Sequence, residues 1–126
     1  MVFVNLLTEQ MVSDGKRLTK LLERNFAVNA SLWFYDSELN TWRLIIASSD
    51  VRTFGPRWVY SKIRSILYRN LHDVRISLNS ISVVDDRDPL IISLRSAIGR
   101  HGVSGMRLSA NAVNGVFIED VLIYKL

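Results

Sequence analysis

Hydrophobic positions recur at helical spacing from about Phe3 to Phe26 and predict a long amphipathic helix. The residues that form its apolar stripe, at about 100° per residue, are Val4, Leu7, Met11, Leu18 and Leu22. Asp14 and Gly15 interrupt this stripe, and a glycine inside a helix costs roughly 1 kcal/mol relative to alanine. We expect a kink or a close packing contact at this point, or else a break into two helices.

The next segment predicts a β-hairpin. Residues 30–35 are an aromatic, strand-forming run, and residues 41–47 supply a second run of the same kind. The link between them begins with Asp36 and ends with Asn40, whose side chains stabilise turns through local backbone hydrogen bonds. Because both faces of these strands carry apolar side chains, we expect a sheet that is covered on both sides, by helices or by a second subunit.

Glycine and proline then mark a second helix. Pro56, directly after Gly55, suits the first turn of a helix, where its missing N–H costs nothing. We expect this helix to run to about Leu71. Residues 74–78 predict the start of a third strand, which resumes through residues 81–84 after a short break.

The remainder of the chain predicts a third helix and a second hairpin. Asp88 is a suitable N-cap, and Pro89 is a suitable first helical residue. The Asn-Gly pair at 114–115 lies between two strand-forming runs, residues 106–113 and 116–124. This pair is the strongest short-range hairpin signal, because both central residues of a type I′ turn need positive φ.

The resulting order, α-β-β-α-β-α-β-β, predicts an α+β fold in which about three helices pack on a mainly antiparallel five-stranded sheet. We expect one globular domain, residues 1–126. In its first half, the helix-hairpin-helix pattern resembles the small sensory and scaffold modules of the GAF and profilin-like kind, which also set strand pairs between helices. The resemblance rests on pattern and implies a fold, with no functional residues carried over.

Composition fits this picture. The 126 residues are 48% hydrophobic and 22% charged, which is typical of a folded domain and excludes a disordered chain. No apolar run approaches the ~18–20 residues that span a bilayer, and the first residues lack the basic region of a signal peptide. With no cysteine, disulfides, thiolate metal sites and cysteine nucleophiles are excluded. We therefore expect a cytoplasmic protein without membrane contact.

Positive charge is concentrated in one stretch. Residues 52–75 hold six basic residues against one acidic residue, whereas the whole chain has a net charge of +4. On the helix predicted from Pro56, these cations and several aromatic residues lie away from the apolar stripe. Such a mixture is typical of a surface that meets an anionic partner. The candidate partner-binding or nucleic-acid-binding residues are Arg57, Trp58, Lys62, Ser65, Tyr68 and Arg69.

A structural alternative exists for this set. Trp58 also fits a position packed under residues 51–55 near the start of the helix, with the cations merely solvated.

Acidic residues offer a weaker chemistry. Asp85, Asp86 and Asp88 form the densest cluster, and a metal-dependent nuclease would need such carboxylates to converge on Mg²⁺. However, Asp88 already suits a helix cap, while Glu119 and Asp120 point to opposite faces of one strand. We therefore predict no metal ligands, no catalytic residues and no cofactor.

The pattern as a whole favours a non-catalytic binding or regulatory module, an adaptor that acts through protein–protein interaction. The final strand is apolar on both faces, which favours self-association as a homodimer through the sheet. An alternative is a nucleic-acid-binding protein, possibly a metal-dependent nuclease, that uses the basic helix 56–71. A third is a small-ligand sensor with its pocket between sheet and helices.

Overall fold

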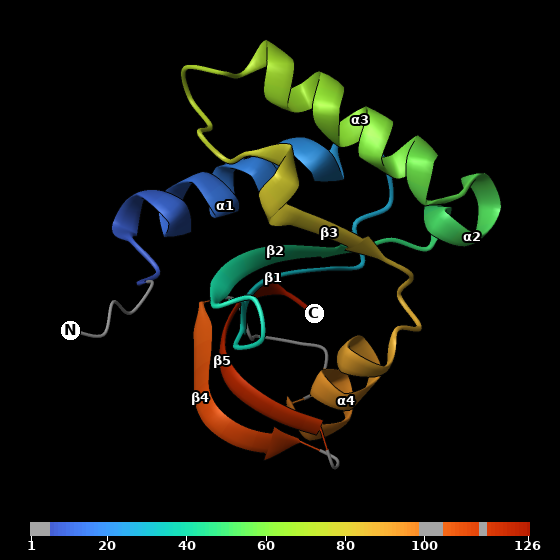
Figure 1. Cartoon of the computed structure of the whole chain (residues 1–126). Coiled ribbons are helices and arrows are strands. Elements are labelled where there is room, and N and C mark those ends of the chain that lie inside the picture. Colours follow the sequence, from blue (N-terminus) through green and yellow to red (C-terminus); the bar gives the residue numbers. More distant parts are fainter. Residues whose placement is uncertain (1–5, 99–104, 114–115) are drawn as a thin grey trace.

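A computed structural model describes residues 6–98, 105–113 and 116–126, and the side chains of residues 109–113 and 116–119 lie outside this description. The described part contains four α-helices and one five-stranded sheet (Figure 1), which confirms the predicted α+β class and, broadly, the order of elements. None of these helices is both long and apolar enough to cross a membrane. The elements are α1 (Glu9–Glu23), β1 (Ala30–Asp36), β2 (Thr41–Ala47), α2 (Asp50–Phe54), α3 (Pro56–Arg69), β3 (Ile81–Val84), α4 (Pro89–Ile98), β4 (Met106–Val113) and β5 (Val116–Lys125).

The sheet has the strand order β3-β2-β1-β5-β4 and is mixed. β1 runs antiparallel to both β2 and β5, and β4 runs antiparallel to β5. The predicted antiparallel arrangement is thus right for these pairs, but β3 pairs parallel with β2, from Leu44 opposite Ile81 to Ala47 opposite Val84. A parallel pair needs a long crossover, and α2 and α3 lie between these two strands in the chain.

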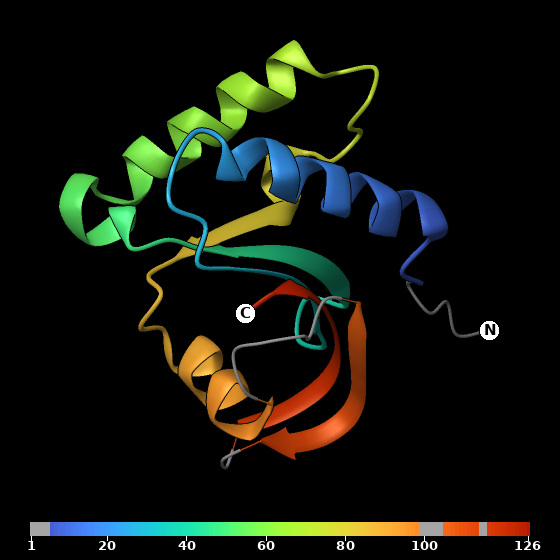
Figure 2. The same cartoon turned by 180° about the vertical axis from the view of Figure 1, so that it is seen from behind.

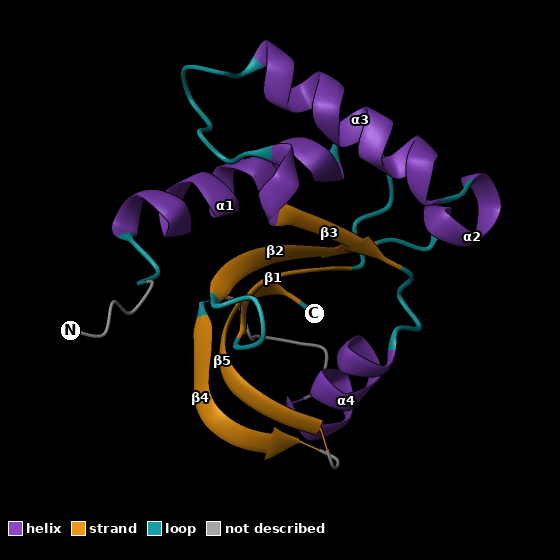
Figure 3. Cartoon of the chain, in the orientation of Figure 1, coloured by secondary structure: helices purple, strands orange, loops and turns teal. Residues whose placement is uncertain are grey.

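Helices of the same chain cover both faces of the sheet, as predicted (Figures 1 and 2). α1 and α3 lie on one face, where Trp33 and Leu44 are buried. α4 lies on the other face of the sheet, and β5 and β4 curve around this helix (Figure 3). There Leu94 of α4 packs with Leu32 and Ile123. Alternate residues along β1, β2 and the described end of β5 therefore enter different clusters, as the two-residue period of a strand requires.

α1 is continuous through Asp14 and Gly15, so the expected close packing contact is confirmed and the expected break is not found. A Cβ atom at Gly15 would lie 2.5 Å from Tyr124 Oη and 2.6 Å from Trp33 Nε1. Thr8 caps the helix by accepting the N–H of Met11 at 3.1 Å, so α1 begins later than Phe3. The glycine thus lets α1 approach the sheet more closely than any side chain would allow.

Polar groups line this contact between α1 and the sheet, and each has a partner. Trp33 Nε1 donates to Met11 O at 3.2 Å and to Tyr124 Oη at 3.0 Å, and Tyr124 Oη donates to Val12 O at 2.6 Å. Burial raises the pKa of Tyr124 to about 12; the hydrogen bond from Trp33 opposes this rise and the negative charge of Asp14 adds to it.

Two further polar side chains of α1, those of Asp14 and Thr19, are buried and have hydrogen-bond partners of their own. Asp14, which is 1% exposed, accepts the side-chain amide of Gln10 at 2.9 Å and the backbone N–H of Arg75 at 3.1 Å. The hydroxyls of Thr19 and Ser31 lie 2.7 Å apart. Buried polar groups cost free energy unless they are hydrogen-bonded, and these are.

Two local predictions are corrected. The strand expected at residues 74–78 is wrong, because only residues 81–84 form β3. Val74 and Ile76 alternate inward like strand residues, but the backbone N–H of Arg75 bonds to Asp14 of α1 instead of to a neighbouring strand. The other correction is α2, a short fourth helix that the sequence did not reveal.

Candidate functional site: the exposed face of helix α3

α3 forms because its apolar residues recur on one side and because its start is well specified. Val59, Ile63 and Ile66 are buried against the rest of the core. The backbone of Gly55 has a φ of +87°, which glycine adopts without steric cost, and this turns the chain from α2 into α3. Pro56 follows as the first helical residue, as predicted. The opposite side of the helix is left to solvent.

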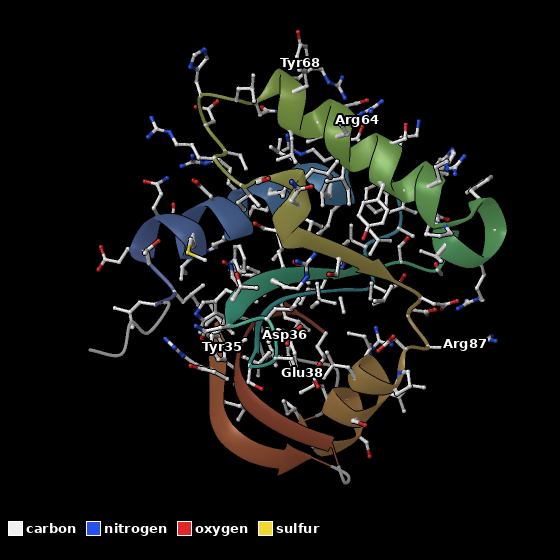
Figure 4. All side chains as sticks on the ribbon, in the orientation of Figure 1. Tyr35, Asp36, Glu38, Arg64, Tyr68 and Arg87 are labelled. Carbon is white, nitrogen blue, oxygen red and sulfur yellow. The ribbon has the colours of Figure 1, made fainter. Side chains whose placement is uncertain are left out.

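This opposite side carries seven exposed residues that we call the α3 cationic face. It contains no carboxylate, since no aspartate or glutamate occurs in residues 56–69. Tyr68 is 77% exposed, and Figure 4 shows Arg64 and Tyr68 directed away from the sheet. The members of the α3 cationic face are Arg57, Ser61, Lys62, Arg64, Ser65, Tyr68 and Arg69.

The four cations of this face have no acidic partner among the described residues, unlike Arg52 and Arg107. Arg107 pairs with Asp120, which raises the pKa of Arg107 mainly through a side-chain hydrogen bond. Arg52 pairs with Asp85 and Asp86. The ion pairs found within residues 6–98, 105–113 and 116–126 include none of the cations of α3. Their charge therefore faces solvent without local neutralisation.

The cations form two rows. Arg57 and Arg64 are seven residues apart, and so are Lys62 and Arg69, which places the members of each row about 10.5 Å apart along the helix. At about 100° per residue the two rows lie about 140° apart around the axis. The hydroxyl groups of the face occupy the ridge between them: Ser61, Ser65 and Tyr68.

A shallow groove of about 600 Å³ runs along the second half of α3 and contains four of the six residues predicted from sequence. Those four are Lys62, Ser65, Tyr68 and Arg69. The groove adds three residues that the prediction missed: Asn25, Arg64 and Ile66. Arg64 lies within the basic stretch, so charge alone could have identified it. Asn25 follows α1 in the chain, and only the packing of α1 against α3 brings it here.

The other two predicted residues lie outside this groove. Arg57 lines a second depression of about 350 Å³, together with Arg64 and Tyr60. Trp58 is half-buried against the core, its ring stacks on Phe54 at 4.4 Å, and Lys62 Nζ lies 5.1 Å from the ring centre. Trp58 thus contacts the segment 51–55, as the structural alternative predicted, and is less available to a partner than Tyr68.

The acidic cluster serves the fold. Asp88 Oδ1 accepts the N–H of Leu90 at 3.0 Å, so the predicted cap of α4 is present. Asp85 and Asp86 both bind Arg52, whose pKa is raised chiefly by the hydrogen bond with Asp86. Desolvation opposes ionisation of Asp85, but the N–H of Arg87 and the Arg52 guanidinium outweigh it and lower the pKa of Asp85.

No group of three metal-ligating side chains occurs in the described part of the chain. The side chain of Glu119 lies outside the described residues, so its predicted direction is not placed. His72 is exposed in the turn that follows α3.

Comparison with protein-family models, with curated proteins and with solved structures gave no match.

Proposed function

We propose that this chain is a binding module that captures an anionic macromolecule through the α3 cationic face. The observation that supports this most directly is the row geometry of four exposed cations that have no carboxylate partner among the described residues. Uncompensated like charges on one helix repel each other and add nothing to folding stability. Binding of an anionic partner would neutralise these cations, which explains why they are gathered on one exposed face.

Binding is favoured over catalysis because the carboxylates with the best spacing for acid–base or metal chemistry already have structural partners. Asp85 and Asp86 bind Arg52, and Asp88 caps α4. This supports the non-catalytic adaptor that the sequence suggested.

The shape of the face supports a macromolecular partner over a small ligand. Small-molecule sites usually enclose most of the ligand surface within a concave pocket. The α3 cationic face is instead the open side of a single helix, with only a shallow groove along it. Both partner classes suggested by the sequence, an acidic protein surface and a nucleic acid, suit such a face.

Self-association remains part of the proposal and has one supporting feature. β4 forms one edge of the sheet and pairs with β5 on one side only. Edge strands present unpaired backbone N–H and C=O groups to a second chain. We propose that two copies pair through β4, which predicts a particle of twice 14.4 kDa by light scattering. A particle of 14.4 kDa at every concentration tested would reject the dimer and leave the α3 proposal intact.

Charge reversal on α3 tests the binding proposal. The double variant Lys62→Glu/Arg69→Glu is compared with Lys16→Glu/Lys20→Glu, which makes the same change in net charge on the exposed surface of α1. Fluorescence anisotropy with labelled poly-glutamate, heparin and duplex DNA is measured at about 50 and 200 mM salt. We expect the wild-type chain to bind at least one polyanion, the α3 variant to lose about tenfold or more in affinity, and the α1 variant to keep most of it.

Melting temperatures of all three proteins complete this experiment, because an unfolded variant would also fail to bind. If the α3 and α1 variants lose the same affinity, the loss is due to net charge alone, and the α3 site is rejected. Absence of binding to every polyanion at the lower salt concentration would reject the proposed function.

A further inference from the structure

Resting on the proposed function, we infer that the anionic partner is duplex DNA, whose major groove receives the α3 cationic face. An α-helix with its side chains is about 10–12 Å in diameter, and the major groove of B-form DNA is about 12 Å wide. α3 forms the outermost edge of the molecule in both views of the fold (Figures 1 and 2). It therefore can enter a groove without a clash from the sheet.

The two rows of cations carry the argument for a duplex. Arg57 and Arg64 lie on one flank of α3, and Lys62 and Arg69 lie on the other, about 140° away around the axis. A single extended chain that lies along a convex helix can neutralise one flank well but not both. The major groove, in contrast, has a phosphate backbone on each side, so a helix inside it meets phosphates on both flanks.

The ridge between the rows suits the floor of the groove. Ser61 and Ser65 carry small hydroxyl groups that both donate and accept hydrogen bonds. Serine hydroxyls can therefore contact both donor and acceptor groups on the base edges, as well as phosphate oxygens. Arg57 and Arg69, the first and last cations, are about 18 Å apart along the axis. The α3 cationic face is therefore long enough to contact several successive base pairs along the groove.

Other anionic partners fit less well. Single-stranded nucleic acid is usually held by aromatic rings that stack on successive bases, but Trp58 is half-buried and stacked on Phe54, which leaves Tyr68 as the exposed ring of the face. Duplex RNA has a major groove too narrow and deep for a helix to enter. An acidic peptide would leave one row of cations without a partner.

Removal of one row at a time tests the inference. The variants are Arg57→Gln/Arg64→Gln and Lys62→Gln/Arg69→Gln, with Lys16→Gln/Lys20→Gln on α1 as the matched control. Affinities for a DNA duplex, an RNA duplex of the same length and sequence, a single strand and poly-glutamate are measured over a range of salt. We expect each row variant to lower duplex-DNA affinity about tenfold at about 50 mM salt, and to reduce the salt slope by about 0.9 per cation removed.

The outcomes separate the inference from the proposed function. Similar losses in both row variants, with duplex DNA bound more tightly than duplex RNA, support insertion in the major groove. Insertion in the major groove is rejected if only one row variant loses affinity. It is also rejected if RNA or single strands bind as tightly as duplex DNA. Either result leaves the proposed binding module in place. Preference for poly-glutamate would identify an acidic protein partner. Failure to bind any of the four probes rejects both statements.

Discussion

α1 and α3 cover the same face of the sheet, but they place their polar residues in opposite positions. α1 turns Asp14 and Thr19 into the core, where each finds a hydrogen-bond partner. α3 turns four cations outward, where the described residues offer no carboxylate to pair with them.

The difference distinguishes polar groups that hold the fold from polar groups that are available to a partner. Substitutions in the α1 network should change the free energy of unfolding. Substitutions on the α3 cationic face should change binding and leave the free energy of unfolding within about 0.5 kcal/mol. The following predictions test this division, beginning with the largest expected change in stability.

Gly15→Ala should be the most damaging of these substitutions. The added Cβ would lie 2.5 Å from Tyr124 Oη and 2.6 Å from Trp33 Nε1, so α1 must move away from the sheet. Overpacking and the loss of buried hydrogen bonds outweigh the roughly 1 kcal/mol that alanine contributes as a helix former, and we expect a net loss of about 2–4 kcal/mol. Urea unfolding measures it, with the exposed Ser13→Ala as control. A variant as stable as the wild-type chain would contradict the close packing.

Trp58→Ala tests which residues of α3 stabilise the fold and which are available to a partner. Because Trp58 is half-buried and stacked on Phe54, we expect a loss of about 2 kcal/mol. Tyr68→Ala, on the same helix but 77% exposed, should cost less than about 0.5 kcal/mol. Thermal unfolding of the two variants compares them directly. If Trp58→Ala is as stable as Tyr68→Ala, then Trp58 does not stabilise the fold and is available to a partner. Its predicted role in binding would then gain support.

Tyr124→Phe should have a smaller effect than Gly15→Ala at neutral pH and a distinct effect at high pH. The hydroxyl donates to Val12 O and accepts from Trp33, so its removal should cost about 1–2 kcal/mol. Tyr35→Phe is the control, since the Tyr35 hydroxyl lies at the surface and bonds to exposed Asn40.

The pH dependence follows from the raised pKa of Tyr124. Its proton is held more tightly in the folded state, so its contribution to stability is complete below the unfolded pKa of about 10. That contribution is lost as pH rises toward the folded pKa of about 12. Urea unfolding between about pH 9 and 11 should show a steeper decline for the wild-type chain than for Tyr124→Phe. Parallel declines would remove Tyr124 from the buried network.

Much of the local structure could be predicted because the responsible signals lie within a few residues of one another. Asp88 caps the helix that Pro89 begins, and Gly55 and Pro56 begin α3, as expected. The contact predicted at Gly15 is also present. The candidate site was predicted in part: helical spacing identified Lys62, Tyr68 and their neighbours, whereas Asn25 was missed because its place beside α3 depends on a contact between two helices.

By itself, then, the sequence determined where most helices and strands form, which side of α3 faces solvent, and that this side is positively charged. Those properties depend on periodicity, caps and composition, which act over one or two turns. Only the tertiary structure decided that β3 joins β2 in parallel, and that Asp14 and Tyr124 each form hydrogen bonds between distant segments of the chain. It also decided that Arg52 neutralises the acidic cluster while the cations of α3 keep their charge exposed. These arrangements depend on which distant segments meet, and that is set by the packing of the whole core.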